Sequence, residues 1–157
     1  MSRLWVVAGG LAAVLALDVG GAMSQSSAAA PETAPIVVPL DSEATVGGLR
    51  VACTGVGQSK DDPRWKAYPI RIEFSNPAGD LLANGAIKVS NPAGAVLASV
   101  SCEGPWILLR PAGVVTGAKA AYRVAGWLPG KGYPSQTATF VTPASGQRIV
   151  DLRFPDA

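Results

Sequence analysis

Hydrophobic and polar residues alternate along most of this chain after Gly48. Such alternation is typical of β-strands with one buried and one solvated face. The clearest example is the segment 70–74, where Arg71 and Glu73 separate three apolar residues. The segment 106–109 is almost wholly apolar, which predicts a central strand. Further strands are predicted at 49–53, 87–89, 96–102, 121–127, 137–142 and 147–154.

Turn sequences separate these segments at short intervals. Asn-Pro-Ala-Gly occurs twice, at 76–79 and 91–94. Asparagine closes Asx turns, proline presets φ, and glycine accepts positive φ. About seven short strands separated by such turns predict an all-β, antiparallel Greek-key β-sandwich. One short helical turn is expected at 61–67, with Asp62 as the cap and Pro63 at the first helical position.

The first 24 residues follow a different pattern. A basic start at Arg3 precedes an apolar run over 4–17, and small residues follow as far as Ser24. This is the layout of a secretory signal peptide. As a helix, the run would cover roughly 21 Å, which is shorter than a bilayer core of about 30 Å. Export followed by cleavage is therefore favoured over a retained membrane anchor, and a periplasmic or secreted location is expected.

The rest of the chain divides in two by composition. Residues 25–47 hold serine, alanine, proline and acidic residues without a clear period, which favours a flexible linker. Residues 48–157 have the length of a single β-sandwich domain. The net charge of +2 is small and evenly spread. This argues against nucleic acid as a partner, and against membrane contact other than through the export signal.

Two cysteines, Cys53 and Cys102, are the only ones in the chain. In an oxidising compartment, an even pair at long spacing favours a disulfide. Strand parity directs both sulfurs toward the predicted core, as a bridge requires. Closing a loop of about fifty residues would contribute roughly 4 kcal/mol of stability in the chain-entropy model. A weakly redox-active pair is the lesser alternative, because no Cys-x-x-Cys motif lowers either thiol pKa.

The sequence argues against enzymatic chemistry. The chain contains no histidine, and neither Ser-x-x-Lys nor Gly-x-Ser-x-Gly follows the signal segment. The adjacent pair Asp61 and Asp62 lies beside Lys60 and Arg64, which favours ionised, solvated carboxylates. Two cysteines alone cannot complete a zinc site. We therefore expect no catalytic residues, metal or cofactor.

Aromatic residues in predicted loops suggest a binding surface. Trp127, Lys131 and Tyr133 lie in the sequence Trp-Leu-Pro-Gly-Lys-Gly-Tyr, and Trp65 lies in an earlier loop. Rigid aromatic side chains on loops stack sugar rings or anchor partners. The alternative is that Trp65 and Trp127 cover the open ends of the core. These four residues are the candidate contacts.

Gly104, Pro105 and Trp106 form a candidate core motif, with Trp106 expected to pack against the disulfide. Together with 111–113 and 122–124, this segment resembles the Gly-Pro-Trp and Leu-Pro-x-Gly-x-Tyr-x-Val pattern of small exported bacterial proteins with a carboxypeptidase regulatory-like domain. The resemblance covers about 51–154 and includes 53–57 and 81–83. Arg110 replaces the family's usual leucine, and 114–121 lengthens the step from glycine to tyrosine.

This resemblance implies a transthyretin-like, seven-stranded Greek-key sandwich that serves as a non-catalytic accessory module. We expect a non-enzymatic exported module with a structural or interaction role, whose partner is a protein or an envelope polymer. The alternative is carbohydrate or cell-envelope polymer binding through the aromatic loop at 127–133.

Overall fold

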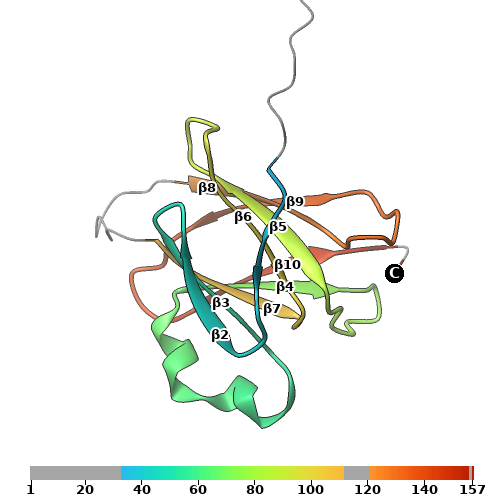
Figure 1. Ribbon diagram of the computed structural model, residues 1–157, viewed down its shortest axis with the longest axis horizontal. Coiled ribbons are helices and arrows are strands. Elements are labelled where there is room, and N and C mark those ends of the chain that lie inside the picture. The colour runs from blue at the N-terminus through green and yellow to red at the C-terminus, as the bar shows by residue number, and fades with distance from the viewer. Residues whose placement is uncertain (1–32, 112–120, 156) are drawn as a thin grey trace, which may run out of the picture. The chain divides into compact units, whose positions relative to one another are not determined.

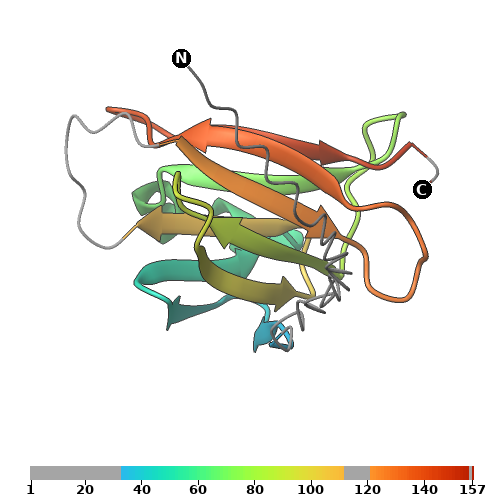
Figure 2. The same ribbon diagram turned by 90° about the horizontal axis from the view of Figure 1, so that it is seen from above.

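Two β-sheets packed face to face contain the strands of the described residues (Figure 1, and in a perpendicular view Figure 2). The computed structural model describes residues 33–111, 121–155 and 157, and over these it has ten strands in two five-stranded sheets. Sheet A has the order β1 (Ile36–Val38), β6 (Val96–Cys102), β5 (Gly85–Ser90), β8 (Ala121–Trp127) and β9 (Gln136–Val141). Sheet B has the order β10 (Arg148–Arg153), β4 (Ile70–Ser75), β7 (Trp106–Pro111), β3 (Leu49–Thr54) and β2 (Ser42–Val46).

The core lies between the sheets and follows the alternation of the strands. Phe74 of β4 is fully buried and stacks on Phe154, with ring centroids 6.1 Å apart. A Cβ atom on Gly85 of β5 would lie only 2.4 Å from the Phe74 ring, so the absence of a side chain there lets the sheets approach. The fully buried aliphatic residues of this core include Val51, Ile70, Ile72, Ile87, Val89, Val100, Ile107 and Val124.

The predicted all-β sandwich is confirmed, but the prediction of about seven antiparallel strands needs correction. Each sheet is mixed, because β1 pairs in parallel with β6 and β10 pairs in parallel with β4. Both parallel pairs lie at sheet edges, where the chain crosses from one sheet to the other. Alternation with a period of two shows which side chains share a face of the sheet, but it does not show whether neighbouring strands are parallel or antiparallel.

The prediction of a flexible linker at 25–47 is wrong for residues 36–46, because β1 and β2 lie there. Val38 is buried in the core at 1% exposure and pairs with Cys102. Gly47 and Gly48 have φ angles of 55° and 78° and form the two-residue turn from β2 to β3. β1 (Ile-Val-Val) contains no polar residue to alternate with, and β2 (Ser-Glu-Ala-Thr-Val) has only two apolar residues, so neither strand shows a clear alternation. The predicted signal peptide, 1–24, lies outside the described residues.

The expected helical turn is present as a 3-10 helix, η2 (Pro63–Ala67), preceded by a second one, η1 (Gly57–Asp61). The Asp62 side chain accepts a hydrogen bond of 2.9 Å from the Arg64 amide, so the predicted cap is confirmed. Over the described ranges no α-helix occurs, and none of their helices is long and apolar enough to cross a membrane.

The two Asn-Pro-Ala-Gly segments form the same turn, as their sequences predict. In each, the asparagine Oδ1 accepts a 2.9 Å hydrogen bond from the amide four residues later, Asp80 or Ala95. The glycine amide bonds back to the asparagine carbonyl, at 3.0 Å from Gly79 and 2.9 Å from Gly94. The second turn joins β5 to β6 and forms part of the surface described below.

Candidate functional site

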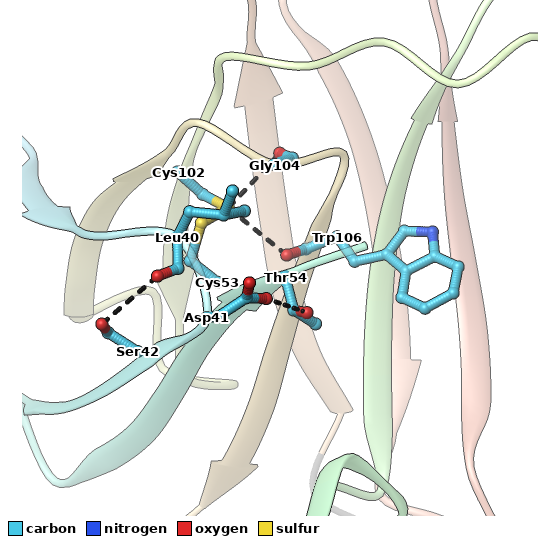
Figure 3. The surroundings of a disulfide bond; sticks show 8 residues. All are labelled: Leu40, Asp41, Ser42, Cys53, Thr54, Cys102, Gly104 and Trp106. Carbon is cyan, nitrogen blue, oxygen red and sulfur yellow. Dashed lines mark hydrogen bonds between the residues drawn. A yellow bond between two sulfur atoms is a disulfide. The ribbon is translucent and has the colours of Figure 1, made fainter. Parts of the chain in front are cut away.

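A disulfide between Cys53 and Cys102 joins sheet B to sheet A and confirms the predicted bridge (Figure 3). Cys53 lies in β3 and Cys102 in β6, with Cα atoms 5.4 Å apart. Both residues are buried, at 0% and 3% exposure, so the bridge is a structural staple within the core. The bond is consistent with an oxidising extracytoplasmic environment.

The segment after Cys102 packs closely on the end of β3. A Cβ atom on Gly104 would lie 2.3 Å from the Thr54 carbonyl oxygen, so only glycine fits without a shift. The Cys102 sulfur lies 3.3 Å from the Gly104 carbonyl oxygen and 3.4 Å from that of Trp106. Since a bridged sulfur has no proton to donate, these are close contacts and not hydrogen bonds. Gly104 and Pro105 are both buried, which supports their assignment to the core motif.

The prediction that Trp106 packs against the disulfide is wrong for its side chain. In the β3–β7 register, Cys53 pairs with Ile107 and Thr54 pairs with Trp106. Adjacent strand residues face opposite sides, so the indole leaves the core and lies on the outer face of sheet B (Figure 3). There the Arg71 guanidinium stacks 4.3 Å from the centre of the ring.

The outer face of sheet B is covered by the 57–68 segment. Trp65 and Tyr68 are buried at 4% and 2% exposure and pack on Ala52 and Leu108. The Trp65 indole N–H donates to the Ser59 carbonyl at 2.8 Å. Trp65 therefore neither covers an open end of the core nor offers its ring to a ligand.

Arginines complete this cover by stacking on the aromatic rings. Arg64 lies 4.0 Å from the Trp65 ring centre, and Arg50 and Arg110 lie 6.0 and 5.6 Å from that of Tyr68. Arg110 Nε also donates a 2.8 Å hydrogen bond to the Ala67 carbonyl. Arg110 thus ties the 57–68 segment to sheet B.

Burial and neighbouring charge set the titration of two groups on this face, the buried Tyr68 and the exposed Glu43. Burial, reinforced by the nearby Glu43 carboxylate, raises the pKa of Tyr68 to about 12. Desolvation alone would raise the pKa of Glu43, but Arg50, whose Nη2 lies 2.6 Å from Oε2, outweighs it together with Tyr68 and Arg64, so that pKa is lowered. The Tyr68 hydroxyl has no hydrogen-bond partner in satisfactory geometry among the described residues.

A pair of carboxylates not singled out by the sequence lies on the same face. Glu73 and Asp151 are adjacent across the parallel β4–β10 pair, although 78 positions separate them in the chain. Burial, and next the Asp151 charge, raise the pKa of Glu73 against the opposing effect of Arg71 at 2.9 Å. Ser75 Oγ donates to Asp151 at 2.6 Å. Among residues 33–111, 121–155 and 157 no three acidic or cysteine side chains converge as a metal would need.

The outer face of sheet A carries a recess of about 370 Å³ over β5, β8 and the β5–β6 turn. Its walls include the cations Lys88 and Arg123 and the polar residues Ser90 and Asn91. Trp127 lies further along β8 on the same face as Arg123, since the two residues are four positions apart and an even step returns a strand side chain to the same face. Lys88 and Arg123 were not predicted to bind a ligand. In the sequence each is a charged residue between apolar neighbours, as on the solvated face of any strand.

The four predicted contact residues do not form one site. Trp65 lies in η2 over the outer face of sheet B, whereas Trp127 is half-buried on the outer face of sheet A. Lys131 is exposed in the loop after β8, and Tyr133 packs against the central core. No family model matches this chain, and a search of curated proteins finds no match to its sequence.

Proposed function

We propose that this protein is a non-enzymatic, exported β-sandwich module that acts by binding through the outer face of sheet A. The observation that carries the proposal is the recess beside Lys88 and Arg123. As part of the same proposal, the protein is located in the periplasm or is secreted. Its domain is related to the carboxypeptidase regulatory-like, transthyretin-like domains that its sequence resembles.

The contrast between the two outer faces supports this assignment. On sheet B, Arg50, Arg64, Arg71 and Arg110 stack on buried or half-buried rings beneath or beside the 57–68 segment. On sheet A, the outward side chains of β9 include the exposed threonines Thr137 and Thr139, and β8 presents Arg123. Small hydroxyl side chains around a cation leave room for a ligand or partner.

Site-specific photo-cross-linking tests the proposal with a matched pair of threonines. Thr139 lies opposite Arg123 on sheet A, and Thr45 lies opposite Arg50 on the outer face of sheet B. Both are exposed. In cells, a photoreactive residue at Thr139 should give a discrete adduct, and one at Thr45 should not. Equal adducts at both positions would contradict the proposal, as would a hydrolytic activity abolished by one substitution in the domain.

The second candidate is binding of a carbohydrate or cell-envelope polymer through the aromatic loop. It is favoured by the position of Trp127, which is half-buried on the same face as the recess. Envelope glycans should then quench tryptophan fluorescence, and Trp127→Ala should abolish the response while Trp106→Phe retains it. No response across a glycan panel would retire this candidate.

A further inference from the structure

We infer that β9 is the pairing edge of a homodimer, in which two copies of the chain join their A sheets through antiparallel β9 strands. β9 is the outermost strand of sheet A, so one of its sides pairs with β8 and the other has no strand partner among the described residues. An edge strand presents a row of unpaired amide and carbonyl groups, which another extended strand satisfies. The inference goes beyond the proposed function and does not rest on it.

The sequence around β9 lacks the features that prevent edge pairing. No charged residue occurs between Lys131 and Arg148. β9 contains no proline, and it pairs with β8 without the register shift that occurs between β5 and β6. Natural proteins protect exposed sheet edges with charges, prolines, bulges or very short strands. Because β9 has none of these, its edge is open to pairing.

The other edge strands of the two sheets each carry such a protection. β10 has the charged residues Asp151 and Arg153 at exposed positions. β2 carries the exposed charge of Glu43. β1 has only three residues and is followed directly by Pro39. Among the described strands, this contrast distinguishes β9 as the edge suited to pairing.

A second copy of the chain fits this edge better than a flexible peptide does. Each copy already holds β9 in extended conformation, whereas a flexible peptide would lose conformational entropy on binding. Two antiparallel β9 strands related by a two-fold axis perpendicular to the sheet are self-complementary. With the axis at Ala138, the exposed Thr137 of one copy lies opposite Thr139 of the other. Threonine pairs across strands are favourable, and no like charges are opposed.

The pairing joins the five-stranded A sheets of both copies into one continuous sheet. Because the two-fold axis is perpendicular to this sheet, the outer faces of both A sheets lie on the same side. The recesses over β5 and β8 then face the same way. An edge of six residues is a small interface, so we expect a weak, reversible dimer.

Analytical ultracentrifugation of the full chain at concentrations up to roughly 1 mM tests the inference, because small interfaces associate weakly. We expect the average mass to rise toward that of a dimer, and concentration-dependent amide shifts in ¹⁵N-labelled protein to centre on 136–141. Thr139→Lys should weaken self-association at least about tenfold, because it brings like charges together across the two-fold axis. Thr45→Lys is the matched control, since Thr45 is an exposed threonine of the edge strand β2, and it should leave self-association unchanged.

Mixing Thr139→Lys with Thr139→Glu should restore the dimer, because opposite charges then meet across the paired strands. Such a recovery shows that each variant is folded. A chain that stays monomeric would overturn the inference, as would equal effects of Thr139→Lys and Thr45→Lys, or no recovery in the mixture. In the photo-cross-linking experiment, an adduct of two copies reports the dimer and an adduct with another molecule reports the proposed function. A monomeric chain would therefore leave the proposed function standing.

Discussion

Arg71 and Trp106 stack on the outer face of sheet B, with the guanidinium carbon 4.3 Å from the centre of the indole ring. Arg71 also lies 2.9 Å from the Glu73 carboxylate, so one arginine covers a ring and balances a largely buried acid. The Trp106 indole nitrogen is buried without a hydrogen-bond partner among the described residues. The outer face of sheet B is therefore a second packed layer.

Replacing Arg71 with glutamine should destabilise the domain by about 1–3 kcal/mol. The change removes the stacked cation and leaves the Glu73 carboxylate without its partner. Urea unfolding measures the loss. Arg153→Gln is the control, because Arg153 forms an exposed pair with Asp151 at 3.2 Å and should cost no more than about 0.5 kcal/mol. Equal losses in the two variants would show that the stacked position contributes nothing.

Removing the disulfide should cost about 2–5 kcal/mol, because the bridge closes a loop between the sheets and restricts the unfolded chain. The double variant Cys53→Ala/Cys102→Ala should show this loss in urea unfolding without reductant. Intact-mass measurement of the unmodified protein should show the loss of two hydrogen atoms that one disulfide entails. As a control, reductant should lower the stability of the parent protein and leave the double variant unchanged. Equal stability of the two proteins would refute the role of the bridge.

Substituting alanine at Gly85 should destabilise the protein by about 1–3 kcal/mol, the usual cost of overpacking a core. The new Cβ would lie 2.4 Å from the Phe74 ring, so the ring or the sheet must shift. Thermal unfolding reports the change. The double variant Gly85→Ala/Phe74→Leu is the informative comparison, because the smaller leucine makes room for the new methyl group. A double variant that costs the sum of the two single changes would show that the two sites do not interact.

The pH dependence of stability should carry opposite contributions from two glutamates. The folded pKa of Glu73 is raised above its ordinary value of 4.5, so the folded state binds more protons than the unfolded state over the interval just above pH 4.5. Stability should therefore fall as pH rises through that interval, and Glu73→Gln should reduce the fall. Urea unfolding between pH 3 and pH 7 measures it.

Glu43 provides the control for this prediction. Its pKa is lowered, so its contribution is present above pH 4.5 and is lost as pH falls through its folded pKa. Glu43→Gln should flatten the acid side of the profile and leave the Glu73 effect in place. If both variants changed the same limb of the profile, the opposite signs assigned to the two groups would be wrong.

Local sequence was sufficient for several features of this fold. Alternation at 70–74 identified a strand, the two Asn-Pro-Ala-Gly segments identified matching turns, and Asp62 with Pro63 identified a capped helical turn. The parity of Cys53 and Cys102 pointed both sulfurs into the core, where the disulfide lies. Each of these depends on side chains within a few positions, which a single sequence displays directly.

The sequence by itself determined the class of fold, the strands with clear alternation and the disulfide partners, because these follow from local geometry and from the count of cysteines. Only the tertiary structure decided on which side of sheet B Trp106 lies. Both faces of β7 are apolar, since one meets sheet A and the other lies under the 57–68 segment, so alternation could not distinguish them.

Tertiary structure also decided which charged residues become neighbours across strands. Strand register places Glu73 beside Asp151, and Lys88 diagonally across from Arg123. Register depends on contacts between distant segments, and no local pattern records it.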